Sequence, residues 1–316
     1  MVHLASIAAA LVSLSGIGIQ NADVPRVSVT PRTHAPRSAC PSASIRVDTT
    51  LVLVPVTVTD PYGAPFPGLT RDDFQIFENG VEQQLKCFTS EDAAISLGIV
   101  FDASGSMLGK LDQSRTAVAA LFRTAVPGDE FFAVEVRNEP ALLCDLTDDT
   151  QPIEQALAAI QARNTTALRD AIYMAIQHLR HARNSRRALL ILSDGGENNS
   201  RYTKGEIYSL VREADICIHS IALSRWIRLS LDDVSLLRRL SGESGGTFWQ
   251  VAHADELPQA IWKVSAAIRH LYVLCFNSSN PRNDGLYRKI QVRLRPIRGM
   301  PRLHVSWRKG YMAPVW

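Results

Sequence analysis

The chain has 316 residues, of which 46% are hydrophobic and 21% are charged. These are ordinary globular values, which exclude a disordered, collagen-like or coiled-coil protein and allow two or three domains. The formal net charge of +3 is too weak to indicate a nucleic-acid-binding protein. The charge is uneven, because residues 277–316 contain nine Lys or Arg and a single acid, Asp284. We interpret this tail as a strand with one basic, solvent-facing side, and contact with anionic lipid, lipopolysaccharide or nucleic acid is the alternative.

Residues 1–22 are predicted to be a secretory signal peptide or an uncleaved anchor. The stretch from Leu4 to Ile19 carries no charge and is shorter than the ~20 residues that a membrane-spanning helix needs. The segment before it lacks Lys and Arg, and the cleavage site is indistinct. A third alternative is therefore that these residues are neither a signal peptide nor an anchor. Residues 23–44 are rich in Pro and Ser and are predicted to be a linker. We therefore expect an exported protein (periplasmic, cell-surface or secreted) with no further membrane span.

Two segments of β character flank the centre of the chain. Residues 45–90 contain alternating β-branched stretches and the hairpin turn Asn79-Gly80, which predict a small antiparallel β unit. Pro55 indicates an edge strand or a bulge within its first stretch. Residues 271–316 are similar in type, and the two segments are therefore candidates to pack together. Their predicted strands lie at 46–60, 74–78, 81–88, 271–276, 287–294 and 303–309.

Between them, residues 95–270 alternate between continuous apolar runs and helical apolar stripes. Continuous runs are typical of strands that are covered on both faces, and stripes of period 3.6 are typical of helices. This pattern predicts an α/β fold with a doubly wound, mostly parallel, Rossmann-like sheet. The expected strands are 95–101, 130–136, 188–192, 217–223 and 246–251, and the expected helices are 107–125, 152–162, 167–182, 204–214, 232–240 and 255–270.

The five cysteines are widely spaced and form no CxxC pair. Their spacing excludes a metal–thiolate site and does not favour a disulfide framework in a chain of this size. Cys144, Cys217 and Cys275 lie in apolar runs and are expected to be small core residues, whereas Cys40 falls in the linker. A single disulfide is compatible with the sequence, which does not identify its partners.

Oxygen-bearing side chains follow two of the predicted strands and precede one helix. In doubly wound sheets, ligands bind beyond the carboxyl ends of the strands, at the switch point. Carboxylates and hydroxyls without His or Cys suit Mg²⁺, Mn²⁺ or Ca²⁺ and fit Zn²⁺ poorly. The candidate metal ligands are Asp102, Ser104, Ser106, Thr166 and Asp194, with Thr165, Asp170 and Glu197 as secondary candidates.

Simpler interpretations exist for most of these residues. Asp102 and Ser104 are also favoured helix caps, and Asp194-Gly195 also fits a turn. Asp170 fits a first-turn helix acid, and Glu197 fits a solvated side chain. The chain contains neither a nucleophile elbow nor a phosphate-binding loop, so we do not expect an enzyme and assign no catalytic residue.

Three motifs resemble the metal-ion-dependent adhesion site (MIDAS) of von Willebrand factor type A domains. They are Phe101-Asp-Ala-Ser-Gly-Ser-Met, Thr166-Ala-Leu-Arg-Asp170-Ala and Leu190-Ile-Leu-Ser-Asp194-Gly. Outside them, Val56-Thr-Val-Thr-Asp60 and Arg308-Lys-Gly-Tyr-Met-Ala-Pro resemble the exported type A-related proteins of acidobacteria. The resemblance covers roughly residues 45–314 and assigns the type A domain to residues 95–270.

The resemblance also implies roles for the candidate ligands. Ser104 and Ser106 would bind the metal directly, and Thr166 would join them when ligand is bound. Asp102 and Asp194 would act mostly through water. An acidic group of a protein ligand would complete the metal shell, which would make this an exported, metal-dependent adhesion or interaction protein.

Other ligands and functions stay open. Arg163-Asn164-Thr165 stands where the family often has glycines, so Thr165 could substitute for Thr166. The main alternative function is a metal-independent scaffold subunit of a cell-envelope complex. A metal-dependent hydrolase is a remote alternative, because no general base is evident near the site.

Overall fold

The computed structural model describes residues 51–90, 92–162, 166–197, 199–223, 231–296 and 302–315. The chain divides into two units, Met1–Val47 and Asp48–Trp316, and every described element belongs to the second. The predicted signal or anchor segment, the linker and Thr165 lie outside the described residues. Within the described ranges, no helix is both long and apolar enough to cross a membrane.

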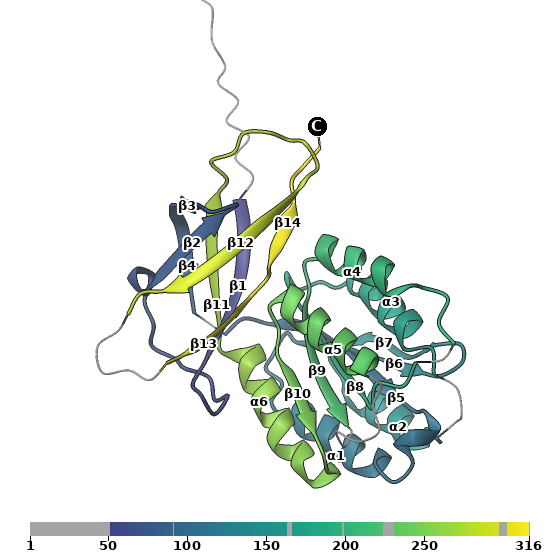
Figure 1. Ribbon diagram of the computed structural model, residues 1–316. Helices are drawn as coiled ribbons and strands as arrows, with labels where there is room; N and C mark the ends of the chain where they lie inside the picture. Colours follow the sequence, from purple (N-terminus) through teal and green to yellow (C-terminus); the bar gives the residue numbers. More distant parts are fainter. Residues whose placement is uncertain are drawn as a thin grey trace, which may run out of the picture. The chain divides into compact units, whose positions relative to one another are not determined.

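The described part of the central region forms a six-stranded sheet in the order β10-β9-β8-β5-β6-β7 (Figure 1). Neighbouring strands run parallel except at β7, which pairs with β6 in the antiparallel sense. The predicted doubly wound, mostly parallel α/β fold is therefore confirmed. The strands are β5 (Ile95–Asp102), β6 (Glu130–Val136), β7 (Ala141–Thr147), β8 (Arg186–Ser193), β9 (Cys217–Leu223) and β10 (Phe248–Val251).

Helices cover both faces of this sheet. Successive strand residues point to opposite faces, so each strand contributes side chains to the core on both sides. Ile99 and Phe101 of β5 belong to one hydrophobic cluster and Val100 belongs to the other. The first cluster includes residues of α1 (Leu111–Phe122), α2 (Gln151–Ala159) and α6 (Leu257–Arg269). The second includes residues of α3 (Leu168–Leu179), α4 (Lys204–Glu213) and α5 (Leu231–Ser244).

Over the described ranges, the two β segments form two four-stranded sheets that share one hydrophobic core. The orders are β13-β1-β11-β4 and β14-β12-β2-β3. Because β1 pairs with β11 and β2 pairs with β12, each sheet combines strands from before and after the central region. The strands are β1 (Leu51–Thr59), β2 (Phe74–Glu78), β3 (Val81–Gln83), β4 (Leu85–Thr89), β11 (Leu271–Asn277), β12 (Tyr287–Leu294), β13 (His304–Trp307) and β14 (Gly310–Met312).

Some elements differ from the prediction. The helix expected at 107–125 begins only at Leu111, because Gly105–Met107 is a 3₁₀ turn and Gly109 has φ of +81°, which a right-handed helix does not accept. β7 was not predicted, since its residues are half-buried or exposed and carry no continuous apolar run. Two further 3₁₀ turns, Arg71–Asp73 and Ala254–Glu256, precede β2 and α6.

Pro55 lies where β1 has a partner on one side only among the described strands. Among the described strands, β13 pairs with Val56–Thr59 and stops short of Pro55. On the other side Pro55 is opposite Val273 of β11. β1 is thus an edge strand at Pro55, as predicted for a residue without an N–H donor, although it is an inner strand further along.

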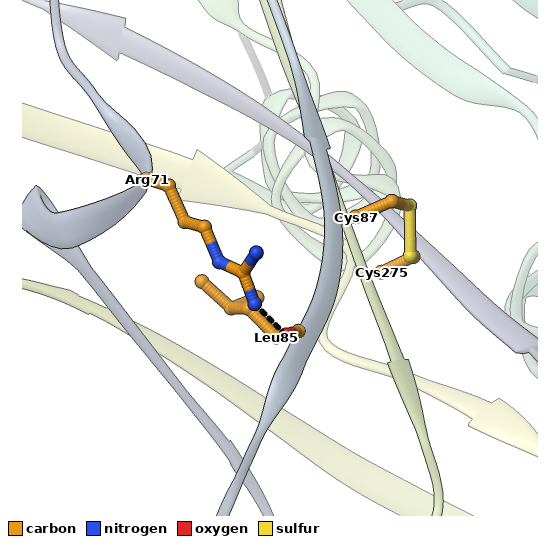
Figure 2. The surroundings of a disulfide bond; sticks show 4 residues. All are labelled: Arg71, Leu85, Cys87 and Cys275. Atoms are coloured by element: carbon orange, nitrogen blue, oxygen red, sulfur yellow. Dashed lines mark hydrogen bonds between the residues drawn. A yellow bond between two sulfur atoms is a disulfide. The ribbon is translucent and has the colours of Figure 1, made fainter.

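A disulfide joins Cys87 on β4 to Cys275 on β11 (Figure 2). The two residues face each other in the antiparallel ladder, with their Cα atoms 5.0 Å apart. Cys275 is therefore buried, as predicted, but it is bonded rather than a simple core residue. Cys217 is a buried free thiol. Cys144 is only half-buried on the edge strand β7, where it packs against the first hydrophobic cluster. Cys40 lies outside the described residues.

Candidate functional site

The two strands that carry the acidic motifs end at the same edge of the central sheet. Phe101 pairs with Leu192 in the parallel ladder, so Asp102 ends β5 next to Ser193, the last residue of β8. From β5 and β8 the sheet continues through β6 and β7 on one side and through β9 and β10 on the other (Figure 1). This is the switch point at which doubly wound folds bind ligands.

Asp102 is fully buried at this edge. Its Oδ1 accepts a hydrogen bond from the backbone N–H of Ser104 at 2.8 Å, and its Oδ2 accepts one from Ser193 Oγ at 2.5 Å. Burial is the largest influence on the pKa of Asp102, which rises from 3.8 to about 6. The hydrogen bond from Ser193 lowers this pKa and the negative charge of Asp194 raises it. A nearby cation would stabilise the charged form of this carboxylate.

The hydroxyl candidates lie beside the two carboxylates. Ser104 Oγ and Ser106 Oγ are 3.1 Å apart in the loop after β5. Thr166 is buried, and a Cβ added to Gly196 would lie 3.6 Å from Asp194 Oδ1 and 4.0 Å from Thr166 Oγ1. Both of those oxygens therefore border the backbone of Gly196. The structure thus gathers the five predicted ligands from three loops at one edge of the sheet.

Neither Asp102 nor Ser104 caps the α-helix that follows. α1 begins at Leu111, and its N-cap residue is Lys110. Ser104 precedes the 3₁₀ turn but makes no side-chain capping hydrogen bond to it. The simpler interpretation of these two residues as caps of that helix is therefore wrong.

The secondary candidates Asp170 and Glu197 accept hydrogen bonds that hold neighbouring segments. Asp170 Oδ1 accepts from the backbone N–H of Arg201 at 2.9 Å. Glu197 Oε2 accepts from the backbone N–H of Arg169, at the start of α3, and from Ser200 Oγ at 2.6 Å. The Glu197 side chain is only 5% exposed, so its interpretation as a solvated residue is wrong. These contacts give both acids a role in anchoring the loop before α4.

Two residues that contact the predicted ligands were not predicted from the sequence. Ser193 donates to Asp102, and a hydroxyl at the end of an apolar strand was the available signal. Lys110 Nζ lies 3.2 Å from Asp194 Oδ2 and donates to the carbonyl oxygen of Leu223 at 3.0 Å. No local sequence pattern predicts the contact between Lys110 and Asp194, because the two residues are 84 positions apart.

The donor set fits a hard divalent cation. It consists of two carboxylates and three hydroxyls, which are oxygen ligands of the kind that Mg²⁺, Mn²⁺ and Ca²⁺ prefer. In the described part of the chain, no three His, Cys, Asp or Glu side chains gather into a metal-holding group. A metal site at this edge would therefore depend on hydroxyls, and the two buried carboxylates would supply its negative charge.

Residues 97–197 match the family model for the von Willebrand factor type A domain. The matched range includes all five candidate ligands. The human protein inter-alpha-trypsin inhibitor heavy chain H4 is 28% identical over 167 residues, which cover 46% of this chain. The chain spans only 18% of the length of that relative.

Two solved structures are similar in fold. A von Willebrand factor type A protein from Catenulispora acidiphila has a TM-score of 0.49 and 14% identity, covering 77% of this chain and 74% of its own. Proximal thread matrix protein 1 from the mussel byssus, solved with a zinc-occupied MIDAS motif, has a TM-score of 0.48 and 18% identity, covering 60% and 49%. On the match of residues 97–197 to the family model, this chain contains a von Willebrand factor type A domain.

Proposed function

We propose that this protein is an exported, divalent-metal-dependent interaction protein that binds an acidic group of a partner protein. The cluster of buried carboxylates and hydroxyls at the switch point is the observation that carries the proposal. Ser104, Ser106 and Thr166 would contact the metal directly. Asp102 and Asp194 would hold its water ligands. Mg²⁺ takes six oxygen ligands, so a carboxylate of the partner can occupy the remaining position.

The electrostatics of the site support a bound cation. Asp102 is fully buried and Asp194 is 6% exposed, so two carboxylates are withdrawn from water at one edge of the sheet. Burying carboxylates close together is costly unless a positive charge compensates them. The ammonium of Lys110 supplies part of that compensation at Asp194, and a divalent cation would supply the rest. The open position in the oxygen shell of that cation would accept an acidic ligand.

Export is supported by the disulfide and by the N-terminal sequence. Disulfides form and persist in oxidising compartments such as the periplasm and the extracellular space. The bond between Cys87 and Cys275 and the uncharged stretch from Leu4 to Ile19 both agree with such a destination. Cell fractionation, followed by mass spectrometry of the mature N-terminus, tests it. Recovery of the reduced, full-length chain from the cytosol would contradict export.

Calorimetric titration with Mg²⁺ tests the metal site. We expect the wild type to bind one Mg²⁺ and Asp102→Ala to bind about tenfold more weakly or worse, because a carboxylate that orients the metal shell is lost. Asp112→Ala is the matched control, since Asp112 has a 91% exposed side chain on α1 and pairs with Arg115. Equal affinities for the wild type and Asp102→Ala would refute the assignment.

Affinity capture from an envelope extract tests the dependence of partner binding on metal. We expect a partner that is retained with Mg²⁺, lost with EDTA and recovered when Mg²⁺ is restored. The same partner should not be retained by Asp102→Ala. A partner that stays bound in EDTA would instead identify the metal-independent scaffold function.

A further inference from the structure

The structure places a positive charge of the chain itself in the candidate metal site. Lys110 Nζ is 3.2 Å from Asp194 Oδ2, where the two side chains are 30% and 8% exposed. The same ammonium donates to the carbonyl oxygen of Leu223, the last residue of β9, at 3.0 Å. Lys110 reaches both groups from the N-cap of α1, so three separate elements converge on one ammonium.

We propose that Lys110 and the divalent cation compete for Asp194, so that Lys110 lowers the metal affinity of the site and is released when metal binds. This inference rests on the proposed function, because it requires a metal at the cluster.

The charges at the site favour competition between Lys110 and the metal. Asp102 and Asp194 carry the negative charge that would attract a cation, and Lys110 already neutralises part of it at Asp194. A divalent cation held through the same carboxylates would stand close to the ammonium. Like charges repel strongly at short range where burial limits screening by water. The cation and Lys110 therefore cannot both be bound at full strength.

The geometry of Asp194 is also compatible with a positioning role for Lys110, which would change the metal affinity in the opposite direction. Lys110 contacts Oδ2, whereas Oδ1 is the oxygen that borders Gly196 near Thr166. A lysine that merely held Oδ1 in place for the metal would increase metal affinity. Competition decreases it, so the change in affinity on removing the charge of Lys110 distinguishes the two roles.

The release of Lys110 would also affect its contact with Leu223, which lies outside the group of candidate ligands. When metal displaces Lys110 from Asp194, the ammonium loses the carboxylate that holds it beside the end of β9. Metal binding would then loosen the link between the start of α1 and the end of β9. Lys110 itself would become more accessible to solvent reagents, which provides a readout that does not require a partner.

Mg²⁺ titration of matched variants tests the inference. We expect Lys110→Met to bind Mg²⁺ about three- to tenfold more tightly than the wild type, because it keeps the aliphatic stem and removes the charge. Lys110→Arg, which keeps the charge, should remain close to the wild type. Lys289→Met is the control for net charge, since Lys289 is exposed on β12 in another sheet and its loss should leave the affinity unchanged.

The outcomes separate this inference from the proposed function. If the wild type binds Mg²⁺ and Lys110→Met binds it equally or more weakly, competition is refuted while the metal site stands. If neither protein binds Mg²⁺, the proposed function and the inference both fail.

Chemical labelling of the wild type gives a test that does not depend on any variant folding. An amine-reactive reagent should modify Lys110 several-fold faster in saturating Mg²⁺ than in EDTA, while Lys289 should react at one rate in both. Peptide mass spectrometry quantifies each site. An unchanged or slower rate at Lys110 in Mg²⁺ would overturn the proposed release.

Discussion

At the scale of single residues, the pKa of Asp102 would set the pH range in which the proposed site holds metal. The carboxylate is fully buried, and burial raises its pKa to about 6. The hydrogen bond from Ser193 Oγ stabilises the charged form and opposes part of this rise. In the proposed site, Asp102 would hold water ligands of the metal in its charged form, so protons and metal would compete for this carboxylate near pH 6.

The first prediction concerns the pH dependence of metal binding. The folded-state pKa of Asp102 lies above the ordinary value of 3.8, so the carboxyl is charged at pH 7 and mostly protonated at pH 5. Competition by one proton should therefore weaken Mg²⁺ binding about tenfold between pH 7 and pH 5. Calorimetric titration at the two pH values measures this change, which Asp102→Asn should lack. The same affinity for the wild type at both pH values would contradict it.

At the scale of elements, β5 is the strand that positions the site. All of its residues are buried, and it pairs with β6 on one side and β8 on the other. Gly98 lets the neighbouring strands pack closely, because a Cβ there would lie 2.4 Å from Phe132 Cζ and 2.9 Å from Leu189 Cδ1. This packing holds the strand whose end carries Asp102 against the strand that leads to Asp194.

The second prediction concerns this packing. Gly98→Ala should lower the free energy of unfolding by about 1–3 kcal/mol, because the added methyl group has no room. Denaturant unfolding measures the change. Gly242→Ala is the control, since Gly242 lies in α5 with nothing within 4 Å of an added Cβ, and it should stabilise the protein by up to about 1 kcal/mol. Unfolding of Gly98→Ala at the wild-type denaturant concentration would show that β6 and β8 yield to the methyl group.

At the scale of the whole molecule, the α/β region is an insertion between two strands of one sheet. β4 ends at Thr89 and β11 begins at Leu271, and the two strands are neighbours in that sheet. The disulfide between Cys87 and Cys275 spans 188 positions and so encloses the entire α/β region. Figure 2 shows Arg71 donating to the carbonyl oxygen of Leu85 on β4, the strand that carries Cys87.

The third prediction concerns this cross-link. Replacing Cys87 and Cys275 together by Ser should lower the free energy of unfolding by about 2–5 kcal/mol, because the unfolded chain gains the freedom of a long open loop. Denaturant unfolding under oxidising conditions measures the loss. Cys144→Ser is the control, since Cys144 is a half-buried free thiol. If the double variant matched the wild type, the cross-link would not stabilise the fold.

The sequence by itself determined the succession along the chain of the central strands and helices, apart from β7, and the residue types of the candidate site. Strands covered on both faces must be continuously apolar, and helices on a sheet must carry an apolar stripe, so these elements were visible as patterns. Asp102, Ser104 and Ser106 lie in one loop, so local spacing sufficed to group them. β7 escaped prediction because an edge strand with exposed residues lacks such a pattern.

Only the tertiary structure decided which distant residues meet. It paired Cys87 with Cys275 across an antiparallel ladder, and it brought the ammonium of Lys110 to Asp194. It also placed Ser193 against Asp102, where its hydrogen bond opposes part of the rise in the pKa of Asp102 that burial causes. Sequence patterns report whether a residue is buried and how a segment repeats, which depend on near neighbours. Contacts between separate elements depend instead on strand order and register, which arise only when the whole chain packs.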